Sequence, residues 1–216
     1  MVENLMELMQ SSLTPRLAGD VSTYLGESPS TSRSAASAAI PAVLTRLAQQ
    51  SATAAGAAQV FEAISSPQID TGLADNPGGW LGGGSQTADL LSQGNAMLRN
   101  LFGERTGAIT DAISSVSGMK MTSASTLLSL AVPAIFAWLK RHLIRGGLDA
   151  AGLAGLLGGQ GEHLQYRLDD RVTSALGFAT PAALVASLAS GAAGHASAAA
   201  GRVANAARDV GSVRCV

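Results

Sequence analysis

Two stretches of the chain that lie 92 positions apart share one pattern of residues. Ser37–Leu47 aligns with Ser129–Leu139, and the alignment places Pro41 on Pro133. Self-similarity at a fixed spacing is the sequence signature of a repeated supersecondary unit, and it limits the folds that the chain can adopt. We therefore predict an internally duplicated fold. Alanine-rich helices that resemble one another by chance are the alternative.

The alignment continues on both sides of these stretches. The spacing is 92 upstream and 93 downstream. The upstream pairs are Leu17 with Ile109, Val21 with Ile113, Tyr24 with Val116 and Gly26 with Gly118, and the downstream pairs are Ala57 with Ala150, Ala58 with Ala151, Val60 with Leu153 and Ile64 with Leu157. The predicted copies therefore span residues 1–65 and 87–160.

Each copy has the apolar spacing of helices. Leu17, Val21 and Leu25 follow the i, i+4, i+8 rule for one buried stripe. Thr14 followed by Pro15 predicts the end of one helix and the start of the next. The expected helices are 2–13, 15–25, 32–50 and 54–65 in the first copy, and 87–102, 107–117, 123–143 and 149–157 in the second.

Proline lies in the middle of one predicted helix in each copy, at Pro41 and Pro133. Proline inside a helix removes a backbone hydrogen bond and crowds the preceding turn, which kinks the helix at a cost of about 3 kcal/mol. We expect a bend at both positions. The predicted fold class is all-α, a helical bundle with pseudo-twofold symmetry between its two halves.

Residues 66–86 form a different kind of segment, rich in glycine, proline and aspartate. Such turn-forming residues favour a linker between the two copies. After the second copy, residues 161–216 are rich in alanine and glycine and predict a C-terminal helical arm. Thr180 and Pro181 are typical of a helix start within this arm.

The predicted arm carries one stripe of mostly small residues. Small side chains allow close helix contact but bury little area, at about 25 cal/mol per Å2, so the arm needs a surface to cover. We expect that surface to belong to the same chain or to another copy. The residues predicted for self-association are Leu184, Leu188, Ala192, Ala199 and Val203.

Composition and charge exclude several classes of protein. The formal net charge is -1, which provides no overall attraction for nucleic acid. The single cysteine, Cys215, cannot form a disulfide within the chain. The apolar run Leu127–Leu139 is shorter than the about 20 residues that cross a bilayer, so a buried core helix is expected. The acidic N-terminus lacks the pattern of a signal peptide, which predicts a cytoplasmic protein, with envelope association as the alternative.

The segments Ser123–Ile135 and Gly147–Leu157 resemble the DUF937 family, bacterial proteins of unknown function to which the YidB-like proteins are related. The resemblance covers about residues 1–159, in both copies. It implies an all-helical, internally duplicated bacterial unit with no established activity. Some family members carry an OmpA-like envelope domain, and residues 161–216 do not resemble one. The family offers no catalytic residue to carry over.

The chain contains no recognisable pattern of reactive residues. His142, His163 and His195 are far apart, without the spacing of metal ligands. No Gly-x-Ser-x-Gly motif occurs, and the glycine runs lack the context of a phosphate-binding loop. We therefore predict no catalytic residue, no cofactor and no metal, and we expect that the protein is not an enzyme.

Basic residues gather after the apolar run, next to an aromatic residue. Trp138, Lys140, Arg141 and Arg145 are the candidate contacts to a partner or to lipid phosphates. A solvated helix end is the alternative, since cations there offset the helix dipole. The function expected from the whole sequence is that of a structural or interaction protein that self-associates into a homo-oligomer or larger assembly through its arm. The alternative is a peripheral membrane or envelope-associated protein.

Overall fold

The computed structural model describes residues 5–75, 81–82, 84–180 and 182–188, and these residues contain helices and no strand. The predicted all-α class is therefore confirmed for this part of the chain. Short 3-10 helices are written η. The elements are α1 (Leu5–Leu25), α2 (Pro29–Gln50), α3 (Ala54–Ser65), η1 (Thr71–Ala74), α4 (Ser85–Phe102), η3 (Gly103–Arg105), α5 (Thr106–Ser117), α6 (Met121–Gly146), α7 (Ala150–Gly158), α8 (Gly161–Gln165) and α9 (Asp170–Ala175).

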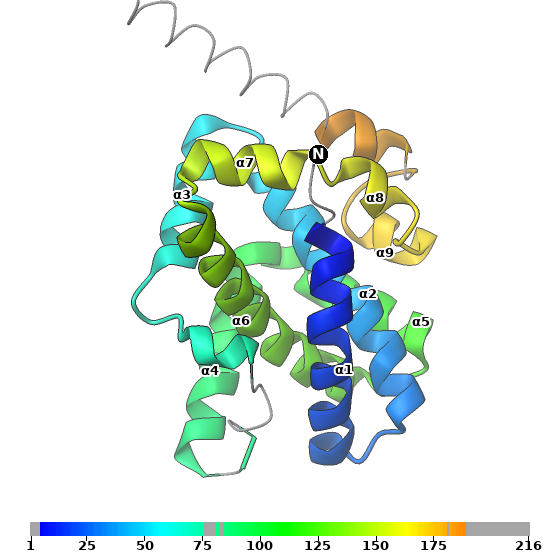
Figure 1. Ribbon diagram of the computed structural model, residues 1–216. Helices are drawn as coiled ribbons and strands as arrows, with labels where there is room; N and C mark the ends of the chain where they lie inside the picture. Colours follow the sequence, from blue (N-terminus) through cyan, green and yellow to red (C-terminus); the bar gives the residue numbers. More distant parts are fainter. Residues whose placement is uncertain (1–4, 76–80, 83, 181, 189–216) are drawn as a thin grey trace, which may run out of the picture.

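The N-terminal part is a helical hairpin of α1 and α2 (Figure 1). Ser28 caps α2 by accepting a 3.1 Å hydrogen bond from the backbone N–H of Thr31, and Pro29 occupies the first helical position. The helix break predicted at Thr14–Pro15 is wrong, because α1 continues through Pro15. Leu13 and Leu17 are buried on either side of this proline, so packing holds the helix together across it.

The long helix α6 forms the centre of the molecule, and α1, α2, α3, α4, α5 and η1 all contact it (Figure 1). It is the one helix of the described residues that is long and apolar enough to cross a membrane, yet 83% of its apolar window is buried. Burial on this scale is typical of a core helix in a folded protein. Pro133 of α6 and Pro41 of α2 both lie buried within continuous helices, and the bends expected there stay predictions.

The other helices surround α6 and α2. Helix α4 packs along α6, α5 packs against α2 and α6, and α3 lies against α7. Asp149 caps α7 by accepting a 2.8 Å hydrogen bond from the N–H of Gly152. Every helix predicted between residues 32 and 157 is present in the structure, with ends shifted by at most a few residues.

The first part of the predicted arm packs on the body of the protein. Helices α8 and α9 contact α2, and α9 also contacts α5. The buried amide of Gln160 accepts a 3.3 Å hydrogen bond from the N–H of Met6. This bond connects the residue just before the arm to the start of α1. The core therefore extends into this region. Its buried members are Leu164, Leu168, Val172, Leu176, Leu184 and Leu188.

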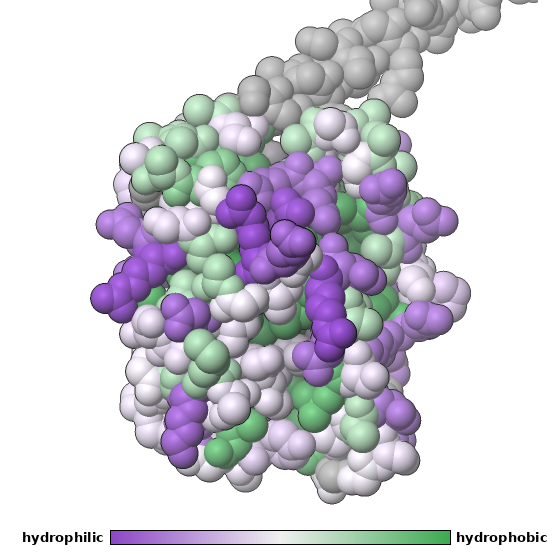
Figure 2. Space-filling model, turned by 180° about the vertical axis from the view of Figure 1, so that it is seen from behind, coloured by the Kyte–Doolittle hydropathy of each residue, from purple (hydrophilic) through white to green (hydrophobic). Residues whose placement is uncertain are grey.

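The face turned away from the view of Figure 1 mixes polar and apolar surface. Figure 2 shows hydrophilic side chains gathered near the middle of that face, with apolar residues in separate patches around them. Scattered apolar residues are normal on a protein surface. This face therefore does not present one continuous apolar area for docking.

Candidate binding groove and the predicted site residues

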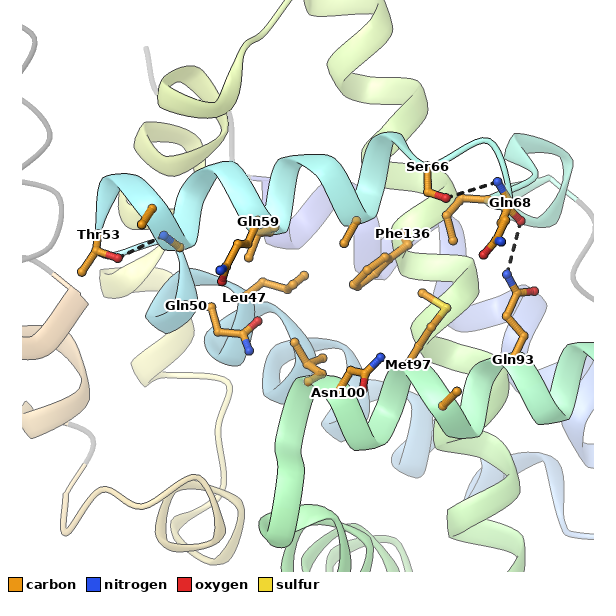
Figure 3. Close-up of a pocket in the computed structure, with 17 residues that line it drawn as sticks. Leu47, Gln50, Thr53, Gln59, Ser66, Gln68, Gln93, Met97, Asn100 and Phe136 are labelled. Atoms are coloured by element: carbon orange, nitrogen blue, oxygen red, sulfur yellow. Dashed lines mark hydrogen bonds between the residues drawn. The ribbon is translucent and has the colours of Figure 1, made fainter.

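A groove of about 670 Å3 runs between α3 and α4. Figure 3 shows α3 along one side, α4 along the other and the Phe136 ring of α6 between them. Its floor is apolar, formed by Leu47, Val60, Met97, Leu101 and Phe136. Pockets with an apolar floor and a few polar groups at the edge are the usual form of binding sites.

A tight turn fixes the wall formed by α3. The Thr53 side chain caps this helix by accepting a 3.1 Å hydrogen bond from the N–H of Gly56. A Cβ atom added to Gly56 would lie 1.9 Å from the carbonyl oxygen of Gln50, at the end of α2. Only glycine fits this close approach, so the sequence determines how α3 leaves α2.

The opposite wall is held by a close crossing of α4 and α6. Gly94 of α4 faces the Ser129 backbone of α6 without room for a side chain. The Ser129 hydroxyl donates a 2.8 Å hydrogen bond to Oδ1 of Asn95, the next residue of α4. Packing and hydrogen bonding together place Met97 and Asn100 of α4 along the groove (Figure 3).

Amide side chains form much of the polar edge. Gln93 of α4 donates a 3.3 Å hydrogen bond to the carbonyl oxygen of Gln68, in the loop after α3, and this contact closes one end of the groove (Figure 3). The amides that line the groove are those of Gln50, Gln59, Gln68, Gln93 and Asn100. They offer both donors and acceptors to an occupant.

Arg46 joins α2 to the end of α4 beside the groove. Its Nε donates a 2.6 Å hydrogen bond to the carbonyl oxygen of Leu101, in the last turn of α4. Burial lowers the pKa of the Arg46 guanidinium, and the nearby charge of Arg105 lowers it further. The cation sits where the helix dipole of α4 favours positive charge, so it has a structural role.

Two of the predicted basic residues, Lys140 and Arg141, hold the predicted linker, residues 66–86. Lys140 donates hydrogen bonds of 2.8 Å to the carbonyl oxygen of Ser66 and 3.0 Å to that of Ile69. Arg141 donates to the carboxylate of Asp75, which Arg16 also contacts at 3.6 Å. Lys140 and Arg141 therefore fasten the predicted linker to α6.

These contacts shift the pKa of the Asp75 carboxyl. The hydrogen bond from Arg141 lowers the pKa of the Asp75 carboxyl below its ordinary value, and the charges of Arg141 and Arg16 act in the same direction. Arg16 also donates to the backbone carbonyl oxygens of Ala74 at 3.2 Å and Asp75 at 2.9 Å. One carboxylate thus links α1, the linker and α6.

The remaining residues of the predicted basic site lie in different surroundings. Trp138 is buried and stacks on the His142 ring with centroids 5.2 Å apart. Arg145 is exposed in the last turn of α6, and its neighbour Ile144 is 68% exposed. The four residues proposed from the sequence are therefore not presented together as one surface.

The residues predicted for self-association also divide into two groups. Leu184 and Leu188 are buried in the core of their own chain, and a Cβ atom at Gly161 would lie 3.5 Å from Cβ of Leu188. Ala192, Ala199 and Val203 lie outside the described residues. The structure therefore accounts for two of the five residues, and it places both of them in the core.

Sequence reasoning missed the groove. Its lining comes from α2, α3, α4, α6 and the loop after α3, which are far apart in the chain. The available signal was a repeated neutral amide in two alanine-containing helices, at Gln59, which is exposed, and at Gln93, which is half-buried. Among the described residues, no group of three or more His, Cys, Asp or Glu side chains is placed to hold a metal ion.

The arrangement defines an all-helical protein with a neutral groove beside its central helix. A family model described as a bacterial protein of unknown function, DUF937, matches residues 7–142. This match covers more than half of the chain, and the protein belongs to that family. It runs from α1 into the last part of α6 and so includes both walls of the groove. No curated protein and no solved structure matches the chain.

Proposed function

We propose that this chain is a non-catalytic interaction protein that self-associates through residues 189–216 of its predicted C-terminal arm. The observation that carries the proposal is the burial of Leu184 and Leu188 in their own chain. The same stripe continues in the sequence through Ala192, Ala199 and Val203. A helical stripe of small residues gains little by burial and needs a second surface to be held.

Measurement of mass in solution tests this function. The full chain should scatter light as a dimer or larger species of its 21.7 kDa protomer, and a chain that ends at Leu188 should be monomeric. Truncation at Gly161 is unsuitable, because it removes buried core residues such as Leu164 and Val172. Monomers in both cases, or equal association in both, would refute the proposed role.

A matched pair of substitutions separates the stripe from the rest of the segment. Ala192 lies on the stripe and Ala193 lies about 100° away from it on a helix. Ala192→Glu should weaken association of the full chain, because burying a carboxylate without a partner is costly. Ala193→Glu should leave the mass unchanged. Equal effects of the two variants would contradict a helical stripe.

We also propose that the chain arose by internal duplication and that its halves pack about a pseudo-twofold axis. Two observations support the duplication: the pattern of buried residues and the backbone conformation of two glycines. Apart from Ala48, each buried residue of α2 has a buried counterpart 92 positions later in α6. Gly26 and Gly118, also 92 apart, both end a helix with positive φ, at 65° and 71°.

The contacts between helices support the same symmetry. If α2 corresponds to α6 and α3 to α7, each helix contacts its own counterpart. The cross contacts are reciprocal as well, since α3 meets α6 and α7 meets α2. Such a pattern is what a twofold axis produces. An experimental structure in which residues 15–65 and 107–157 do not superimpose would contradict the duplication.

The alternative is a peripheral membrane or envelope-associated protein that uses Trp138, Lys140, Arg141 and Arg145. The burial of Trp138 and the internal hydrogen bonds of Lys140 and Arg141 favour the first proposal. Flotation with anionic vesicles of the parent and of Arg145→Glu tests the alternative. Strong flotation of the parent that the variant loses would favour membrane binding.

A further inference from the structure

We propose that the groove between α3 and α4 of one copy binds residues 189–201 of a second copy. This inference rests on the proposed self-association and identifies the surface that receives the C-terminal segment. The groove lies open between its two helical walls, and all of its lining residues are uncharged. An occupant must therefore be uncharged where it meets the floor.

Residues 189–201 have the matching composition. This run contains no Asp, Glu, Lys or Arg, and the first charged residue after it is Arg202. His195 and the serines are its polar side chains. Elsewhere the chain has few runs of this length without a charge, and the long one in α6 is buried in the core. Complementary polarity thus favours this segment as the occupant.

The sizes of the facing side chains also match. Exposed alanines, Ala63 of α3 and Ala96 of α4, line the two walls. The segment supplies alanine and glycine at most of its positions. Small residues on both partners allow a helix of about 20 Å to lie close to the walls, where backbone and side chains make many dispersion contacts.

The amides at the edge of the groove can form hydrogen bonds with the polar groups of this segment. Gln50, Gln59 and Asn100 lie along the groove (Figure 3). An amide can donate to a serine hydroxyl or carbonyl oxygen and can accept from the ring N–H of His195. These hydrogen bonds would give direction to a contact whose apolar area is small.

The position of the described end of the chain favours a second copy as the source of the segment. Leu188 packs near Gly161, at the start of α8. Figure 1 shows this part of the chain beside α8 and α9, across the molecule from α3 and α4. The groove of a neighbouring copy is therefore assigned as the acceptor, and occupation by the same chain is an outcome of the test.

The test introduces a charge on each wall of the groove in the full chain. Ala63→Glu and Ala96→Glu should each weaken association at least about tenfold, measured by light scattering across a dilution series. Ala58→Glu on α3 and Ala88→Glu on α4 are matched controls, since both alanines are exposed and neither lines the groove. The controls should associate like the parent.

A peptide measurement tests the same contact directly. A fluorescent peptide of residues 189–216 should bind the chain that ends at Leu188, and Ala63→Glu should weaken its binding at least about tenfold. Equal binding to the Ala63→Glu chain would overturn the assignment of the groove. A monomeric full chain that blocks peptide binding would show occupation within one chain and would overturn the second-copy assignment.

The outcomes separate this inference from the proposed function. If the chain ending at Leu188 is monomeric while Ala63→Glu and Ala96→Glu associate like the parent, self-association stands and the groove is not its acceptor. If the chain ending at Leu188 still associates, the proposed function fails. Circular dichroism of each variant confirms that the helices are intact before the masses are compared.

Discussion

Gly94 of α4 lies so close to Ser129 of α6 that a Cβ atom at Gly94 would be 1.7 Å from the Ser129 carbonyl oxygen. This contact lets the two helices approach and sets the wall of the groove that carries Met97 and Asn100. Glycine within a helix is normally unfavourable by about 1 kcal/mol relative to alanine. The chain keeps it here because the backbone of α6 occupies the space of a side chain.

Gly94→Ala should therefore destabilise the protein despite the better helix propensity of alanine. The clash is with backbone, which has to shift, so we expect a loss of about 1–3 kcal/mol in the free energy of unfolding. Urea unfolding measures this loss. Gly19→Ala in α1 is the control, since a Cβ atom there meets nothing within 4 Å, and it should be neutral or stabilising. A stable Gly94→Ala protein would show that the helices can separate.

Lys140→Met should weaken the attachment of the predicted linker to α6. The substitution keeps the apolar stem and removes the ammonium that bonds to the carbonyl oxygens of Ser66 and Ile69. Hydrogen bonds to charged groups contribute roughly 1.5–3 kcal/mol, and we expect a loss in that range. Lys120→Met is the control, because this exposed residue is the other lysine of the chain. Similar losses in the free energy of unfolding for both variants would contradict the role of Lys140 in holding the linker.

The contact between Asp75 and Arg141 predicts that the free energy of unfolding depends on pH. Because contact with Arg141 lowers the pKa of this carboxyl, the folded chain keeps the group ionised where the unfolded chain protonates it. Its stabilisation is present above the ordinary pKa of aspartate and is lost as the pH falls through the lowered value. Asp75→Asn should therefore be less stable than the parent at neutral pH, with a difference that shrinks on acidification. Urea unfolding between neutral and acidic pH measures this difference.

Asp111→Asn provides the matched control for that measurement, since Asp111 is exposed on α5. The same dependence on pH for Asp75→Asn and Asp111→Asn would contradict an effect that is specific to Asp75. A constant difference for Asp75→Asn would contradict the role of Arg141. The effect is expected to be modest and to weaken with added salt, because the groups involved are near the surface.

The sequence predicted the helices well where periodicity and caps agreed. The helix expected over residues 149–157 and the buried core helix expected around Leu127–Leu139 are both present, as α7 and α6. The break expected at Pro15 failed for a physical reason. Pro15 and Ser11 are exposed, so the carbonyl that loses its hydrogen bond to the proline can meet water. Burial of Leu13 and Leu17 on one core then outweighs the local signal.

The groove could not be predicted in the same way. It depends on how closely α3 and α4 approach their neighbours, which Gly56 and Gly94 determine through contacts with distant backbone. A glycine in a helical pattern indicates a weak point or a close contact, and the sequence does not say which. The basic residues near the end of α6 were recognised as a group, but their partners, such as Asp75, depend on the path of the linker.

Leu184→Ala tests whether this leucine belongs to the core or to an interface between copies. The side chain is fully buried in its own chain, so truncation should create a cavity and reduce the free energy of unfolding by about 2–5 kcal/mol. The reduction should be the same at low and high protein concentration, because the contact is internal. Tyr166→Ala is the control, since Tyr166 is 83% exposed and its loss should change stability little. A loss of stability for Leu184→Ala that appears only at concentrations where the chain associates would instead assign Leu184 to the interface.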